Sequence, residues 1–81
     1  MKKSKPAAPT PDRAAFAERL EAARIAAKLP ARKDGADALG YPEPRYSRWE
    51  RGEREPSISD IHRICRGFGV TPNYLYGYAK E

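Results

Sequence analysis

The stretch Leu39–Gly52, LGYPEPRYSRWERG, decides the fold, because it joins a turn to a short basic helix. The turn is marked by one glycine and two prolines, Gly40, Pro42 and Pro44. Proline is tolerated only in the first turn of a helix, where its missing N–H would be unpaired anyway. The pattern therefore predicts a helix from Glu43 or Pro44 to about Arg51, with Gly52 as its left-handed cap.

The two faces of this predicted helix differ in chemistry. Helical spacing places Tyr46, Trp49 and Glu50 on one face, and Arg45, Ser47, Arg48 and Arg51 over the rest. An aromatic back with an arginine-rich front suits a negatively charged groove.

Length and charge limit what the chain can be. The 81 residues are enough for one domain. The net charge is +5, but three of the 16 Lys and Arg residues lie among the first five positions. From Asp12 onward, 13 basic residues face 11 acidic ones, so any nucleic-acid site must depend on how the arginines are arranged.

Several classes of protein are disfavoured by the sequence. Cys65 is the single cysteine, which rules out an internal disulfide and fits a reducing compartment. No apolar run approaches the roughly 20 residues of a membrane span, and the basic N-terminus lacks the apolar stretch of a secretory signal. His62 has no Cys or His partner at metal spacing, and no glycine-rich phosphate loop is present. We expect a cytoplasmic protein with no metal, no cofactor and no enzymatic activity.

The chain divides into three expected segments. Residues 1–11 form a flexible basic arm, residues 12–78 the folded domain, and residues 79–81 a tail. The arm could lie along phosphates or serve only as a solubilising leader, and these alternatives stay open.

Two helices are predicted before the central stretch. The first begins after the cap Thr10, carries the apolar stripe Phe16, Leu20, Ala23 and Ala27, and ends at Leu29 and Pro30, with the charged Arg24 beside the stripe. The second covers about Arg32 to Leu39, with Ala36 and Leu39 inward, and Gly35 either weakens it or marks a close approach. Arg32 and Lys33 at its positive end are either solvated or held near a phosphate.

Two further helices are predicted after it. One begins with a capping box of Ser57 and Asp60 and ends at Gly69, and its apolar face comprises Ile58, Ile61, Ile64, Cys65 and Phe68. The last runs from Pro72 to about Tyr76 behind the cap Thr71. Its tyrosines Tyr74, Tyr76 and Tyr78 are a mixed core and surface set or a dimer contact.

From Phe16 to Gly77 the sequence resembles the phage-repressor-like (Xre/Cro-type) helix-turn-helix family. The matching stretches are FAERLEAAR, ADALGYP, YSRWERGEREPS and FGVTPNYLYG. The resemblance implies an all-α, five-helix fold of the lambda-repressor type that acts as a sequence-specific DNA-binding transcriptional regulator, most simply a repressor. It also implies double-stranded DNA as the partner, bound by a homodimer at a palindromic operator with half-sites roughly 34 Å apart.

The resemblance also implies roles for individual residues. Glu50 pairs with Arg24 in a buried ion pair. The base-reading positions are Glu43, Pro44, Ser47 and Arg48. The phosphate-binding positions are Arg45, Arg51 and Arg54, together with the backbone N–H groups of residues 52–55. Arg32 and Lys33 are added to them because they lie at a helix start, which attracts anions.

The sequence departs from the family pattern at several places, two of which bear on the phosphate contacts and the helix starts. Ala31, Arg32 and Lys33 stand where common members carry a polar residue, often Gln, and prolines flank Glu43.

The alternative function is a protein-interaction module, antitoxin-like or regulator-binding, in which DNA contact is secondary.

Overall fold

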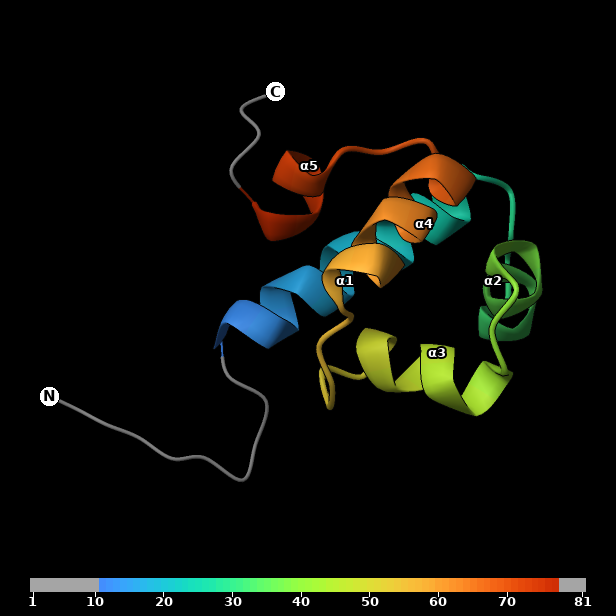
Figure 1. Ribbon diagram of the computed structural model, residues 1–81, viewed down its shortest axis with the longest axis horizontal. Coiled ribbons are helices and arrows are strands. Elements are labelled where there is room, and N and C mark those ends of the chain that lie inside the picture. Colours follow the sequence, from blue (N-terminus) through green and yellow to red (C-terminus); the bar gives the residue numbers. More distant parts are fainter. Residues whose placement is uncertain (1–10, 78–81) are drawn as a thin grey trace, which may run out of the picture.

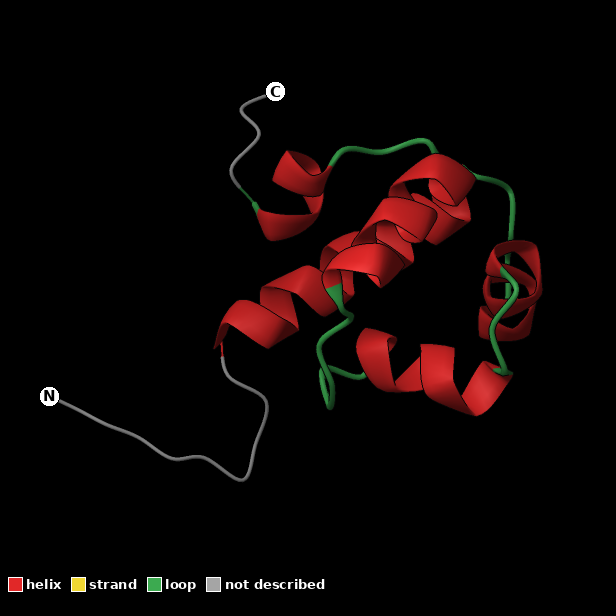
Figure 2. Ribbon diagram, in the orientation of Figure 1, coloured by secondary structure: helices red, strands yellow, loops and turns green. Residues whose placement is uncertain are grey.

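The computed structural model describes residues 11–77, and every regular element within them is an α-helix (Figure 1, Figure 2). The helices are α1 (Pro11–Ala26), α2 (Arg32–Leu39), α3 (Glu43–Glu50), α4 (Ile58–Phe68) and α5 (Pro72–Tyr76). The predicted all-α, five-helix fold is confirmed. Thr10, the arm before it, and Tyr78 with the tail lie outside the described residues.

The helices share one core. α1 packs against α3, α4 and α5, while α2 packs against α3 and α4. The fully buried residues of this core include Leu20, Ala36, Tyr46, Ile64 and Leu75, one from each helix in order from α1 to α5. Burying a large apolar side chain contributes about 1.5–3 kcal/mol, so this shared core is what fixes α3 in place.

The helix boundaries follow the predicted signals closely. α4 begins with the capping box in which the Ser57 hydroxyl accepts from the Asp60 N–H at 3.1 Å. α5 begins at Pro72 behind the cap Thr71, whose hydroxyl accepts from the Tyr74 N–H at 3.1 Å. Gly52 follows α3 with a φ of 75°, the left-handed conformation expected of it.

Two expectations about the helices are wrong. α1 ends at Ala26, before Leu29, because Lys28 adopts a φ of 69° and the Leu29 N–H folds back onto the Arg24 carbonyl at 3.2 Å. Ile58 is 80% exposed although its spacing matched the apolar face of α4. It occupies the first position of the helix, where the chain has not yet reached the core.

Gly35 is required by the arginine beside it. A Cβ built at Gly35 would lie 2.7 Å from Cδ of Arg24 and 3.3 Å from Cζ of Phe68. A close approach of two backbones was expected at this glycine, but its near neighbours are side chains of α1 and α4.

We expect Gly35→Ala to lower the melting temperature. Alanine would gain about 1 kcal/mol in helix propensity, but overpacking in a filled interior typically costs about 1–3 kcal/mol, and Arg24 is held by hydrogen bonds at both ends of its guanidinium. Thermal melts followed by circular dichroism test this, with the exposed α2 change Asp37→Ala as the control. A higher melting temperature for Gly35→Ala would show that Arg24 moves aside freely.

Candidate nucleic-acid interface

The inner face of α3 is anchored by aromatic rings. The Trp49 ring meets Tyr41 edge-on, with centroids 5.0 Å apart, and meets Tyr46 at 5.9 Å. The Tyr46 ring in turn meets Phe68 of α4 edge-on at 6.3 Å. Such edge-to-face pairs add about 0.5–1.5 kcal/mol each beyond the area they bury. The predicted aromatic back of this helix is therefore its core side.

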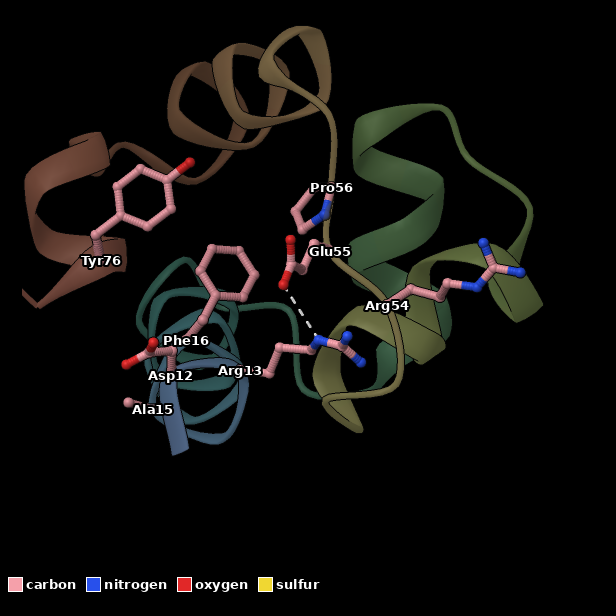
Figure 3. Close-up of a pocket in the computed structure, with 8 residues that line it drawn as sticks. All are labelled: Asp12, Arg13, Ala15, Phe16, Arg54, Glu55, Pro56 and Tyr76. Atoms are coloured by element: carbon pink, nitrogen blue, oxygen red, sulfur yellow. Dashed lines mark hydrogen bonds and ion pairs between the residues drawn. The ribbon is translucent and has the colours of Figure 1, made fainter. Parts of the chain in front are cut away.

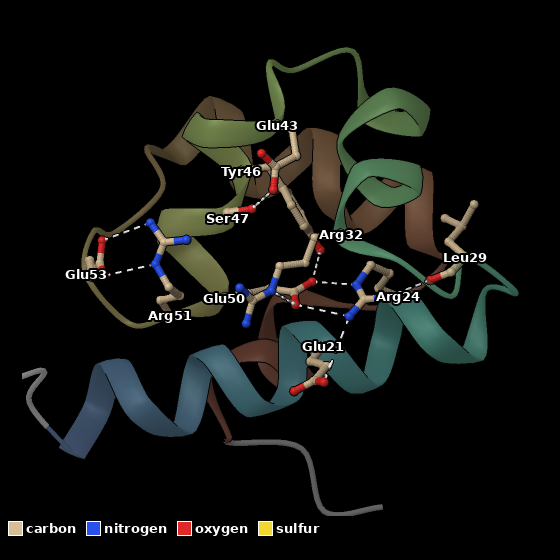
Figure 4. Close-up of polar contacts among 10 residues, drawn as sticks. All are labelled: Glu21, Arg24, Leu29, Arg32, Glu43, Tyr46, Ser47, Glu50, Arg51 and Glu53. Atoms are coloured by element: carbon tan, nitrogen blue, oxygen red, sulfur yellow. Dashed lines mark hydrogen bonds and ion pairs between the residues drawn. The ribbon is translucent and has the colours of Figure 1, made fainter.

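A buried carboxylate, Glu50, joins α3 to α1 and α2 (Figure 4). Its side chain has no exposed area. Nε of Arg24 donates to Oε2 at 2.7 Å, and Nη2 of Arg24 and Nε of Arg32 each donate to Oε1 at 3.2 Å. The Tyr46 hydroxyl also donates to Oε2. A buried charge with four donors is compensated, which is the condition for keeping it inside a small domain.

The partners of Glu50 are themselves tied into the fold. Nη1 of Arg24 donates to the Leu29 carbonyl at 2.8 Å, so this guanidinium also holds the turn after α1. Its hydrogen bonds to Glu50 raise the pKa of Arg24. Burial, with the bond to Glu50 as a further cause, raises the pKa of Tyr46 far above its ordinary value. Both groups therefore keep their protons across the physiological pH range.

Ser47 does not lie on the outer face, contrary to the expectation from spacing. Ser47 is only 1% exposed, and its hydroxyl donates to the Glu43 carboxylate one turn earlier. The side chain therefore has no free path to a base edge. Its observed contact is to orient Glu43, which is exposed at the start of α3.

Arg45 is held by a cluster that the sequence did not predict. Nη2 of Arg45 lies 3.3 Å from both oxygens of Asp60, and Oδ1 of Asp60 also accepts from the Tyr41 hydroxyl at 2.6 Å. The Arg45 guanidinium lies 4.9 Å from the centroid of the Tyr41 ring. The capping-box signal identified Asp60, but no local pattern links it to residues 15 and 19 positions away.

The ionisation of Asp60 makes the fold sensitive to acid. Burial acts to raise its pKa, but the hydrogen bonds from the Tyr41 hydroxyl and from Ser57, with the charge of Arg45, bring the pKa of Asp60 below its ordinary value. An aspartate in an unfolded chain titrates near about 3.9. The stabilisation is therefore complete above that pH and is lost as the pH falls through the lower folded-state pKa.

We expect Asp60→Asn to lower the free energy of unfolding by about 1.5–3 kcal/mol at pH 7, the usual range for hydrogen bonds to a charged group. Urea unfolding of both proteins at pH 7 and pH 3 checks this. The wild type should lose more stability than the variant on acidification, so the two curves approach each other at low pH. A constant difference between them would exclude Asp60 as the acid-sensitive group.

Two cations on this face make no hydrogen bond or ion pair within residues 11–77. They are Arg48, on the exposed side of α3, and Arg54, in the loop between α3 and α4. With Arg45 they line a hollow of about 380 Å³, completed by Trp49 and by Glu55, Ser57 and Asp60 near the start of α4. Three guanidinium groups and the carboxylates of Glu55 and Asp60 line this hollow, so its net charge is positive by one.

The remaining predicted phosphate-binding cations are partly exposed and paired. Lys33 lies 3.0 Å from Asp37, and Arg51 lies 2.9 Å from Glu53. Exposed pairs of this kind contribute little to stability, so their cations are available to an incoming anion at small cost. Arg32 binds Glu50 through Nε, which leaves the outer nitrogens of its guanidinium for another acceptor.

Two of the predicted dimer residues, Tyr74 and Tyr76, lie on α5, and Tyr78 lies outside the described residues. Tyr76 is 52% exposed and its ring centroid lies 6.1 Å from that of Phe16, whereas Tyr74 packs partly against the core. Figure 3 shows Phe16 and Tyr76 around a hollow of about 500 Å³ between α1, α5 and the loop before α4. Arg13 reaches across to Glu55 at 3.2 Å, while Arg54 points away from the hollow.

The geometry defines a helix-turn-helix: α2 and α3 are joined at Gly40, and α3 turns arginines outward. A helix-turn-helix family model matches residues 20–75. The chain therefore belongs to the phage-repressor-like helix-turn-helix family, a family of DNA-binding transcription regulators that are typically not enzymes.

The other comparisons add no relative. Neither the curated proteins nor the solved structures gave a match to this chain. In residues 11–77, no helix combines the length and apolar character needed to cross a bilayer, and no group of three or more His, Cys, Asp or Glu side chains is placed to hold a metal ion.

Proposed function

We propose that this protein represses transcription by binding a specific operator, with α3 in the major groove and α2 across the DNA backbone. The observation that carries the proposal is that Arg48 is exposed and makes no hydrogen bond or ion pair within residues 11–77. It lies on a helix whose opposite face is packed into the core. A rigid support matters because base readout needs donors held at fixed positions. Such a protein acts in the cytoplasm, on the nucleoid.

Base readout falls to the exposed side of α3. Arg48 can donate two hydrogen bonds to O6 and N7 of guanine, the commonest specific contact in the major groove. Glu43, oriented by Ser47, accepts from N4 of cytosine. Pro44 is exposed beside Glu43 and offers an apolar contact, suited to a thymine methyl group.

Phosphate contacts surround these positions and fix the register of the protein on the duplex. On the side of α3 and the following loop they are Arg45, Arg51, Arg54 and the N–H groups of residues 52–55. On the side of α2 they are Arg32 and Lys33, at a helix start where the positive end of the dipole also attracts anions.

Selecting bound sequences from a random pool of duplex DNA tests this proposal. The expected result is an enriched motif that contains a guanine and appears as two inverted half-sites about one helical turn apart. A pool that stays random after repeated rounds would contradict sequence-specific binding. It would favour the protein-interaction alternative, in which Arg45→Ala and Arg48→Ala leave partner binding intact.

We also propose that the protein binds its operator as a homodimer through the region of Tyr74, Tyr76 and Tyr78. The half-exposed Tyr76 ring supports this, because aromatic side chains are enriched at interfaces.

Tyr76→Ser should leave the fold intact and reduce cooperative binding to a two-half-site duplex. Sedimentation on single and paired half-sites measures this, with Tyr74→Phe as the conservative control. One wild-type protomer on each paired-site duplex at saturation would refute the dimer.

A further inference from the structure

α4 carries a basic stripe that the site described above does not use. Ser59, His62, Arg63 and Arg66 recur at spacings of three and four residues, and all four are exposed. This spacing places them along one face of the helix. The stripe borders a hollow of about 450 Å³, which is also lined by Gly67 of α4 and by Ala38 and Leu39 of α2.

The arginines of this stripe lack acidic partners. Neither Arg63 nor Arg66 makes a hydrogen bond or an ion pair with any side chain among residues 11–77. Asp60, the acidic residue of α4 itself, is buried and binds Tyr41, Ser57 and Arg45. Arg63 and Arg66 are thus two neighbouring like charges with no acidic partner in the described part of the chain.

The stripe is continuous with the cations of α3. The Arg63 guanidinium lies 5.0 Å from the centroid of the Tyr41 ring, and the Arg45 guanidinium lies 4.9 Å from the same centroid. The two guanidinium groups therefore cannot be further apart than these two distances combined. Arg66 follows Arg63 by about one turn of helix, or roughly 5 Å along the axis.

We propose that Arg63 and Arg66 bind DNA phosphates that lie outside the half-site read by α3. In this way α4 extends the phosphate contacts that begin at Arg45. This inference rests on the proposed function, because it takes Arg45 as a phosphate contact. A line of closely spaced cations matches a duplex backbone, which carries one negative charge per about 1.7 Å of helix axis. The shared Tyr41 ring holds Arg45 and Arg63 together, so both contacts form in a single approach of the protein.

The test uses the full chain and a labelled duplex of mixed sequence that is longer than one half-site. Binding is measured by fluorescence anisotropy over a range of NaCl concentrations, because the slope of log K against log salt changes by about 0.9 for each phosphate contact. Arg63→Gln/Arg66→Gln should reduce the slope by about 0.9 per lost contact and weaken binding equally on all sequences. Arg66→Gln alone, which leaves the Tyr41 ring contact untouched, should reduce it by about half as much.

The control is Arg19→Gln, because Arg19 lies against Gly77 at the end of α5 and not beside α3. Its slope should equal that of the wild type, and circular dichroism should show the same helix content in all variants. If Arg54→Gln reduces the slope while the double variant does not, the α4 stripe does not bind DNA and the proposed function stands. If the wild type binds no duplex at all, both proposals fail together.

Discussion

Replacing Glu50 by alanine should lower the free energy of unfolding by about 3–5 kcal/mol, the usual effect of removing one partner of a buried ion pair. The substitution leaves the Arg24 guanidinium, which is 4% exposed, without its carboxylate. It also removes the acceptor of the Tyr46 hydroxyl. Small domains are stable by only about 5–15 kcal/mol, so we expect the variant to be severely destabilised, and unfolded at room temperature if the wild type lies at the low end of this range.

Urea unfolding followed by circular dichroism measures this effect, and Glu53→Ala is the matched control. Glu53 also binds an arginine, Arg51, but both side chains are about half exposed, so its loss should change stability little. Similar unfolding midpoints for Glu50→Ala and the wild type would mean that the buried pair does not hold α1, α2 and α3 together.

Replacing Arg48 by alanine should weaken binding to the selected operator by about 1–3 kcal/mol, or roughly 5- to 150-fold in Kd. Arg48 makes no hydrogen bond or ion pair within residues 11–77, so its removal leaves the fold and its stability nearly unchanged. The affinity for mixed-sequence DNA should fall much less, because the phosphate contacts remain. The ratio of the two affinities is therefore the informative quantity.

Arg51→Ala serves as the comparison for this prediction. Arg51 stands at the end of α3 and is proposed to bind phosphate only, so its removal should weaken binding to both kinds of DNA by similar factors. If Arg48→Ala likewise weakens both equally, Arg48 contacts the backbone and the base-reading role belongs to another residue.

The sequence was sufficient to predict the helices because their ends carry local signals. The capping residues Gly52, Ser57 and Thr71 lie within three or four residues of the helix ends that they mark. Their spacing in the sequence is therefore enough to identify them. Ile58 shows the limit of periodicity, because a match to the apolar spacing says nothing about whether the first turn of a helix reaches the core.

The polar contacts of the site were harder to predict from the sequence. The pairing of Arg24 with Glu50, 26 residues apart, was implied only by the family resemblance, and it is present in the structure. The cluster of Tyr41, Arg45 and Asp60 has neither a local pattern nor a family motif behind it. The burial of Ser47 depends on how α3 is rotated against the core, which spacing alone left undetermined.

The central claim is that α3 is held in place by its packing against the core. Its exposed face then makes the contacts that distinguish one DNA sequence from another. Titration of the ¹⁵N-labelled full chain with the selected duplex, followed by amide NMR spectra, tests it most directly. We predict that the largest shifts fall at residues 43–51, with smaller ones at residues 31–33 and 52–55. Shifts concentrated in α5, with α3 unchanged at saturation, would contradict it.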